Sequence, residues 1–185
     1  MKIAILLGSV RAGRQTHKIA YYVEKKLIER GHVVIMLDLG AQPIPLMNER
    51  YGRAELQPPE VTELAQKFQE ADAILLVSPE YHGSFTGVLK NALDYYWKEF
   101  ERKPMGVIAT GSGRMGGINA STQLQHIILS MGAYPVPYKL LVPQIQHAFD
   151  EQMQPVQPEL VKSTERFLNE FLWFANAIVQ AKSHS

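Results

Sequence analysis

The chain of 185 residues contains no cysteine. This excludes disulfides, thiolate nucleophiles and cysteine-based zinc or iron–sulfur sites, and it is typical of proteins from a reducing compartment. A strong charge of one sign is missing too, because 19 basic residues stand against 18 acidic ones and the formal net charge is +1. Such a balance favours neither a nucleic-acid partner nor an anionic membrane, so any recognition of an anion must be local.

Long apolar runs and metal-ligand spacings are also absent from the sequence. No run approaches the roughly 18 apolar residues of a membrane helix, and the short apolar start is followed by Arg11 and Arg14 without a cleavage site. The six histidines are scattered, so we predict no metal site. We expect a cytoplasmic protein that binds neither nucleic acid nor a membrane.

What the chain does contain is an alternation of short apolar runs with helical patterns. Strands are predicted at residues 2–7, 33–37, 73–77, 103–110 and, as an edge strand containing two prolines, 134–138. Helices are predicted at 16–30, 61–71, 86–100, 118–131 and 159–181, with a long loop at 40–59 and a polar surface loop at 144–158. This pattern indicates one domain over residues 1–185 with a flavodoxin-like α/β fold. We expect a three-layer sandwich whose five-stranded parallel sheet has the order 2-1-3-4-5 and helices on both faces.

The loop after the first strand has the composition of a phosphate site. Unpaired N–H groups at a helix start favour anions, and the hydroxyls of Ser9 and Thr16 and the guanidinium groups of Arg11 and Arg14 add donors. It is not a nucleoside triphosphatase loop, because Arg14 and Gln15 occupy the places of the required Lys and Ser or Thr. A plain helix cap with two solvated arginines is the alternative.

A glycine-rich segment, residues 111–116, matches the letters G-x-G-x-x-G. It follows the fourth predicted strand, and no Asp or Glu lies between Arg114 and Phe149 to bind a ribose. We therefore do not predict a site for a permanently bound dinucleotide. The glycines either let the backbone approach a flat ligand or make a tight turn.

The loop after the third strand, residues 79–94, is the third candidate. Tyr81 and His82 stand beside Gly83 and Gly87, but no Ser nucleophile or carboxylate completes a triad around His82. His82 is better explained as a polar loop residue, and no catalytic side chain is predicted.

These segments together resemble a known family. Gly8-Ser9-Val10-Arg11, with the motif Pro-Glu-Tyr-His-Gly-Ser at 79–84 and Gly-Val-Leu-Lys-Asn-Ala-Leu-Asp at 87–94, is similar to the NAD(P)H-dependent FMN reductases, which include azo, quinone and chromate reductases. The resemblance covers roughly residues 2–140. It implies FMN as cofactor, NAD(P)H as co-substrate with NADPH favoured, a small-molecule acceptor and a homodimer or homotetramer.

The resemblance also implies the binding residues. The phosphate residues fall on Ser9, Arg11 and Thr16, the flavin-edge residues on Pro79, Glu80, Tyr81, His82 and Gly83, and the third flavin loop on Thr110, Ser112 and Gly113. Two departures stand out: His82 replaces a common Asn, and Arg14 and Thr16 stand where the family often has Ser and then Asn. Arg14 or Arg50 is expected to meet the 2′-phosphate of NADPH.

The implied function is that of an oxidoreductase passing hydride from NAD(P)H through bound FMN to flavin, quinone, azo or metal-oxyanion acceptors. The alternative is a flavodoxin-like FMN electron carrier, or a regulatory FMN-binding module without nicotinamide turnover. Electron carriers tend to be acidic, whereas this chain has a pI near 8.0. In an oligomer, the aromatic residues around Tyr95 and the loop at 48–51 are expected to complete a neighbour's site.

Overall fold

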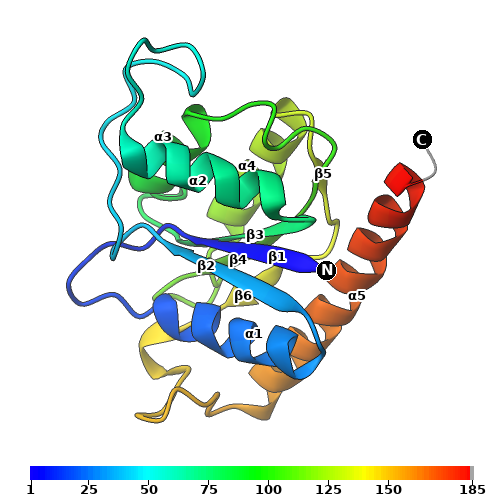
Figure 1. Ribbon diagram of the computed structural model, residues 1–185. Helices are drawn as coiled ribbons and strands as arrows, with labels where there is room; N and C mark the ends of the chain where they lie inside the picture. Colours follow the sequence, from blue (N-terminus) through cyan, green and yellow to red (C-terminus); the bar gives the residue numbers. More distant parts are fainter. Residues whose placement is uncertain (184–185) are drawn as a thin grey trace.

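The computed structural model describes residues 1–183, which form three layers around one parallel sheet (Figure 1). The strands are β1 (Lys2–Leu7), β2 (Val33–Asp38), β3 (Ala73–Pro79), β4 (Pro104–Thr110), β5 (Tyr134–Pro135) and β6 (Leu140–Val142). The helices are α1 (His17–Glu29), α2 (Pro59–Glu70), α3 (Gly87–Asp94), α4 (Ile118–Ser130), α5 (Pro158–Ser183) and a short 3₁₀ helix η1 (Ile145–His147). The order β2-β1-β3-β4-β5 confirms the predicted flavodoxin-like fold.

The central strands are apolar throughout because both faces of the sheet are covered. In β1, Ile3, Ile5 and Leu7 pack toward α1 and α5, whereas Ala4 and Leu6 pack toward α2, α3 and α4. Figure 1 shows these two groups of helices on opposite sides of the sheet. Successive side chains of a strand point to opposite faces, so two separate cores need a continuous apolar run and not an alternating one.

The predicted fifth strand at 134–138 is wrong in extent. β5 has only two residues, and the sheet continues beyond it with β6, which also pairs with β4. Val136 still donates its N–H to the Met105 carbonyl (2.8 Å), but Pro135 and Pro137 have no N–H to give, so the ladder stops and resumes at Leu140. This second strand, β6, leads directly into the short helix η1.

The predicted helix at 86–100 ends early, at Asp94. Tyr95 and Tyr96 are each 2% exposed, so these consecutive side chains are both in the core. The Tyr95 carbonyl accepts the N–H of Tyr51 from the long loop (2.8 Å), which replaces a bond within the helix. Tyr95, Tyr96 and Trp97 therefore do not share a helix, and only Trp97 is exposed, at 49%.

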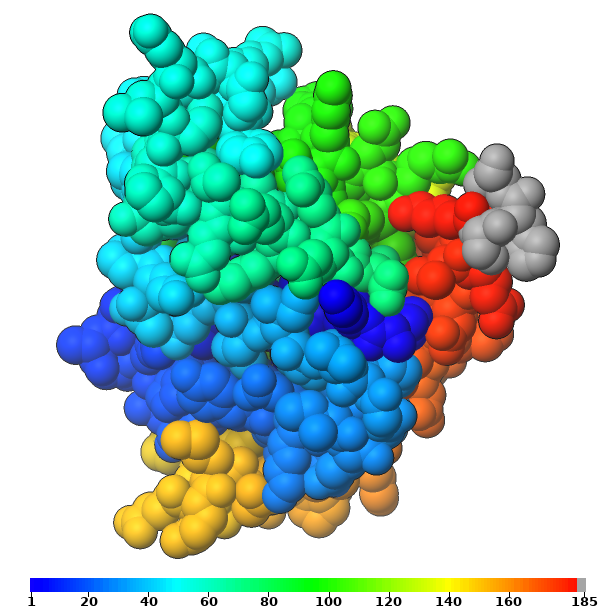
Figure 2. All heavy atoms as spheres, viewed as in Figure 1, coloured from blue at the N-terminus to red at the C-terminus, as the bar shows by residue number. Residues whose placement is uncertain are grey.

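Two loops are more ordered than their composition indicates. The segment predicted as a polar surface loop at 144–158 contains η1 and buries Ile145, Ala148 and Phe149 against the core, so that prediction is wrong in part. The long loop after β2 is tied to α3, because Asn91 accepts from the Met47 N–H and donates to the Pro45 carbonyl, both at 2.8 Å. Its outer part, drawn in cyan, projects at one corner of the molecule (Figure 2).

Within residues 1–183, no helix has the length and apolarity needed to cross a membrane. Nor do three or more His, Asp or Glu side chains of this described part converge in a way that could hold a metal ion.

Candidate functional site

A cavity of ≈ 250 Å³ opens at the carboxyl ends of the sheet strands, where the three candidate loops meet. Its lining comes from the loops after β1, β3 and β4 and from η1, namely Ser9, Arg11, Gly13, Arg14, Gln15, Thr16, Pro79, Glu80, Tyr81, Thr110, Gly111, Ser112, Ile145 and Gln146. In open parallel sheets the ligand site lies at this edge, beside the strand from which the chain winds in two directions. Here that strand is β1, between β2 and β3.

The loop after β1 offers polar groups that have no partner within residues 1–183. The Ser9 hydroxyl is buried and makes no hydrogen bond, and the N–H groups of Arg11, Gly13, Gln15 and Thr16 have no acceptor among the described residues. Thr16 and Thr110 join this loop to the one after β4 through their hydroxyls (Oγ1 to Oγ1, 2.8 Å). Buried polar groups are normally paired, so this set of donors suits an acceptor-rich ligand, and a phosphate fits it.

Arg14 has a different partner from the one predicted. Its Nη1 and Nη2 donate to the two oxygens of Asp38 at 2.5 and 2.6 Å, and Nη1 also donates to the Ser9 carbonyl at 2.6 Å. Burial alone would raise the pKa of Asp38, but the hydrogen bonds from Arg14 and from the Gly40 N–H, together with the charge of Arg14, lower it below its ordinary value. Arg14 is therefore held inside the protein at the cavity wall.

This pair predicts a specific acid sensitivity. Because the pKa of Asp38 is lower in the folded chain than in the unfolded one, its stabilising contribution is complete above the unfolded value of about 3.9 and is lost as the pH falls through the folded value. The free energy of unfolding of wild type should therefore fall more steeply below about pH 4 than that of Asp38→Asn. Urea denaturation at several pH values measures both slopes, and equal slopes would contradict the assignment.

The loop after β3 begins with a tight turn. Tyr81 and Ser84 exchange both backbone hydrogen bonds (2.8 and 3.0 Å), and the two residues between them have positive φ, 51° at His82 and 75° at Gly83. Two consecutive positive φ angles define a type I′ turn, in which Asn-Gly is the favoured pair. This explains why the resembled family commonly has Asn where this chain has His82, and it makes a backbone role sufficient for that position.

We expect His82→Asn to stabilise the protein by about 0.5 kcal/mol, or ~1–2 °C in Tm, because Asn adopts positive φ at lower cost. Differential scanning calorimetry measures the shift. His82→Val, whose branched side chain disfavours positive φ, should lower Tm. A lower Tm for the Asn variant would show that the imidazole itself contributes to the fold.

Helix α4 holds this turn from the other side. The Glu80 carboxylate accepts the backbone N–H groups of Asn119 (2.9 Å) and Ala120 (3.1 Å), which is the favourable position for an acid at a helix start. Gln123 donates to the Gly83 carbonyl at 2.8 Å and accepts from the Ser84 hydroxyl at 2.7 Å. Glu80 thus lines the cavity while its carboxylate is used to cap α4.

The glycine-rich loop after β4 is a tight turn in its second half. Gly116 and Gly117 have φ of 60° and 87°, and a Cβ at Gly117 would lie 2.9 Å from the Thr110 carbonyl. Its first half is fixed by backbone bonds to the end of β6 and the residues that follow it, including Ile145 N–H to the Gly111 carbonyl at 3.1 Å. The loop thereby presents Ser112 to the cavity and brings η1 to its edge.

Most of the predicted binding residues line one cavity, as expected for a common site. The exceptions are His82, Gly83 and Gly113, which do not belong to its lining. The lining also includes Gly13, Gln15 and Gly111, which belong to the candidate loops but were not predicted individually. Sequence reasoning missed Ile145 and Gln146 altogether, because their segment was predicted as surface. The apolar residues Ile145, Ala148 and Phe149 within a Gln-rich stretch were the available signal.

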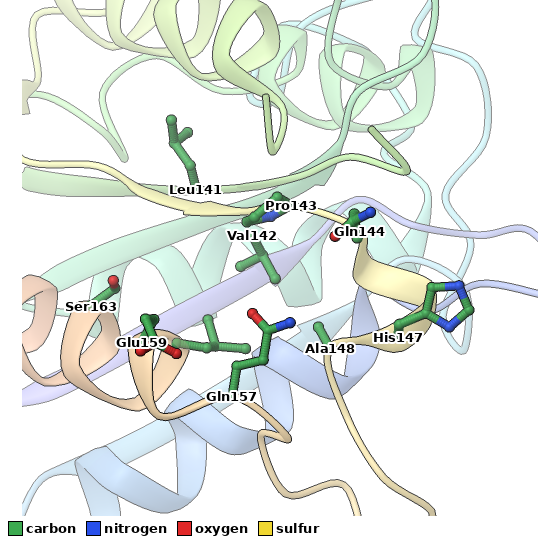
Figure 3. Close-up of a pocket in the computed structure, with 10 residues that line it drawn as sticks. Leu141, Val142, Pro143, Gln144, His147, Ala148, Gln157, Glu159 and Ser163 are labelled. Atoms are coloured by element: carbon green, nitrogen blue, oxygen red, sulfur yellow. The ribbon is translucent and has the colours of Figure 1, made fainter. Parts of the chain in front are cut away.

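A second cavity, of ≈ 120 Å³, lies behind η1 and is formed by β6, η1 and the start of α5 (Figure 3). Its polar side chains come from Gln144, His147, Gln157, Glu159 and Ser163, and it has no Arg or Lys. The Glu159 carboxylate would repel an anion. A phosphate-bearing ligand is therefore matched by the first cavity and not by this one.

Several known proteins are similar to this chain. The sequence profile of a family described as NADPH-dependent FMN reductase matches residues 1–147. An NADPH azoreductase from Bacillus sp. (strain OY1-2) is 28% identical over 174 residues, 91% of this chain and 93% of that protein. An FMN-dependent NADPH-azoreductase from Staphylococcus saprophyticus is 36% identical over 132 residues, 70% of this chain and 68% of that protein. Among solved structures, the flavoenzyme NAD(P)H:(acceptor) oxidoreductase FerB from Paracoccus denitrificans has the same fold, with a TM-score of 0.75, 24% identity and coverage of 97% and 95%.

Proposed function

Because this chain belongs to the NADPH-dependent FMN reductase family, we propose that its cavity binds FMN and that NADPH reduces quinone, azo, flavin or metal-oxyanion acceptors there. Membership makes the protein an FMN-dependent NAD(P)H reductase, with NADPH as the favoured reductant. The azo class of acceptor is supported by the names of the relatives from Bacillus and Staphylococcus. A cytoplasmic location and a single domain over residues 1–185 stay predictions from composition and length.

The observation that carries this proposal is the unpaired Ser9 hydroxyl beside the free N–H groups of the same loop. These donors, with Thr16 and the guanidinium of Arg11, are the groups that would hold the FMN phosphate. Pro79, Glu80 and Tyr81 on one side and Thr110 and Ser112 on the other would hold the flavin portion.

The protein's part in the reaction is orientation and polarity near the ring, while bound FMN supplies the two-electron chemistry. This division agrees with a cavity lining that contains no His and no acid other than the capping residue Glu80. The ring of Tyr81 lies under Arg11, whose Cζ is 5.6 Å from the ring centroid, so the phosphate loop and the flavin loop contact each other across the cavity.

The proposal is tested by reconstitution. Purified protein mixed with FMN and desalted should keep a yellow flavin absorbance, and NADPH added without oxygen should bleach it. A quinone or azo dye should then restore the colour and sustain NADPH oxidation. Protein that retains no FMN would refute the proposal, and protein that retains FMN without bleaching would be an electron carrier or a non-catalytic module.

We further propose a homodimer or homotetramer in which the exposed face around Trp97 is an interface. Trp97 is 49% exposed, and the guanidinium of Arg50 from the long loop covers its ring with Cζ 4.9 Å from the centroid. A groove of ≈ 500 Å³ beside it includes Tyr51 and Tyr95. Trp97→Ala and Tyr51→Ala should reduce the mass found by light scattering and weaken FMN binding. Unchanged mass and affinity would contradict this interface.

The predicted contact with the 2′-phosphate of NADPH now has one better candidate. Arg14 is engaged by Asp38, whereas the Arg50 guanidinium lies over the face of Trp97 and forms no ion pair with the described residues. Comparing kcat/KM for NADPH and NADH in wild type and Arg50→Ala tests this contact. A preference for NADPH that is unaffected by the substitution would remove Arg50 from consideration.

A further inference from the structure

Asp38, the last residue of β2, is not part of the cavity lining but is connected to it through two contacts in series. Asp38 is 8% exposed, and its carboxylate accepts hydrogen bonds from both Nη groups of Arg14. Arg14 in turn donates to the carbonyl of Ser9 at 2.6 Å. Ser9 carries the buried hydroxyl without a partner in the described chain, so these hydrogen bonds lead from Asp38 to a residue of the cavity lining that can still bind a ligand.

We propose that Asp38 is a positioning residue for the phosphate of FMN, acting through Arg14 on Ser9. The inference rests on the proposed function, because it assigns a role toward the cofactor that this site would bind. The carboxylate is itself fixed, since the Gly40 N–H donates to it at 2.9 Å and the Tyr21 hydroxyl lies 3.4 Å from it. A bidentate guanidinium–carboxylate pair has a defined geometry, so Arg14 holds the Ser9 backbone in one place.

Simple electrostatics predicts the opposite result, namely that Asp38 weakens the binding of phosphate. A carboxylate near an anion site repels the anion, so its removal should strengthen phosphate binding. The geometry argues against this reading, because Arg14 is neutralised by Asp38 and its donors are directed into the protein. The lining cation without an ion-pair partner in the described chain is Arg11. Loss of Asp38 therefore frees Arg14 and disorders the loop, which outweighs the lost repulsion.

The experiment compares FMN with riboflavin, which lacks the phosphate, by quenching of flavin fluorescence. In Asp38→Asn the Kd for FMN should rise about tenfold, the order found when a group that orients a ligating residue is removed. The Kd for riboflavin should change less than about twofold. A Kd for FMN that is unchanged or lower would overturn the proposal, and so would equal weakening of both flavins, which indicates general loss of structure.

Gly40→Ala tests the same role independently, because it leaves the charges of Asp38 and Arg14 in place. A Cβ at Gly40 would lie 2.5 Å from Nη1 of Arg14 and 3.2 Å from Oδ1 of Asp38, so it should wedge the guanidinium away from its place. We expect the same selective loss of FMN affinity. Glu29→Gln is the matched control, because it removes a carboxylate from an ion pair with Lys26 at the far end of α1. Its Kd for FMN should stay within about twofold of wild type.

The outcomes separate this inference from the proposed function. If wild type binds no FMN, both are wrong. If wild type binds FMN and both variants bind it equally well, FMN binding stands and the positioning role of Asp38 is refuted. If Asp38→Asn does not fold, Gly40→Ala decides, and a Gly40→Ala protein with wild-type FMN affinity overturns the proposal.

Discussion

Replacing Arg11 with Ala is expected to raise the Kd for FMN about 100-fold. Arg11 lines the cavity and, unlike Arg14, has no carboxylate partner in the described chain, so its charge is available to a phosphate. Two charge-assisted hydrogen bonds at ~1.5 kcal/mol each correspond to roughly this change in affinity. The guanidinium also lies over the Tyr81 ring, and this contact would be lost as well.

Fluorescence titration of apoprotein with FMN measures the effect of Arg11→Ala. Arg11→Lys keeps the charge but loses the forked geometry, so it should fall between wild type and the Ala variant. Arg114→Ala is the control, since Arg114 lies on the neighbouring loop but does not line the cavity. If the control loses as much affinity as Arg11→Ala, the attraction is a general effect of surface charge and the assignment of Arg11 to the phosphate is wrong.

The second large effect is expected in the core, from Phe171→Ala. Phe171 is fully buried on α5, where its ring stacks with Phe167 at a centroid distance of 6.1 Å. Glycine at position 106 of β4 lets the helix approach closely, because a Cβ there would lie 2.9 Å from the Phe171 ring. Little can move to fill the space that the ring leaves. The expected loss is about 3–5 kcal/mol, a large share of the ~5–15 kcal/mol of a typical domain.

Chemical denaturation of the apoprotein measures this loss, and Trp173→Ala on the same helix is the matched control. Trp173 is 70% exposed, so its removal should change the free energy of unfolding by less than about 1 kcal/mol. A loss below about 1 kcal/mol for Phe171→Ala would mean that α5 is not a structural part of the core. Similar losses for both variants would indicate that Trp173 is covered, for example by a second subunit.

The architecture could be predicted from the sequence because its causes are local. A strand covered on both faces must be apolar at every position, and residues 2–7 and 73–77 have this pattern. In a helix that packs against the sheet on one side, apolar residues recur every three to four positions. Counting these elements in order was enough for the strand order 2-1-3-4-5, since right-handed crossovers leave few alternatives.

The elements that the sequence did not predict depend on contacts between distant residues. Helix α3 stops at Asp94 because Tyr51, from a separate loop, supplies the next backbone bond. The fifth strand divides because two prolines interrupt a ladder whose other half belongs to β4. The hydrophobic periodicity within each segment gives no indication of these distant partners.

For the site, the residue types of the loop after β1 predict an anion, since hydroxyls, N–H groups and arginines at a helix start favour one. The sequence alone also supplied the motif that resembles the FMN reductases. Only the tertiary structure decided which arginine is available, because Arg14 and Asp38 are 24 residues apart and Thr16 and Thr110 are 94 apart. Hydrogen bonds between side chains so far apart leave no local pattern, so the fold is what separates the internally paired Arg14 from Arg11, which lines the cavity without a carboxylate partner in the described chain.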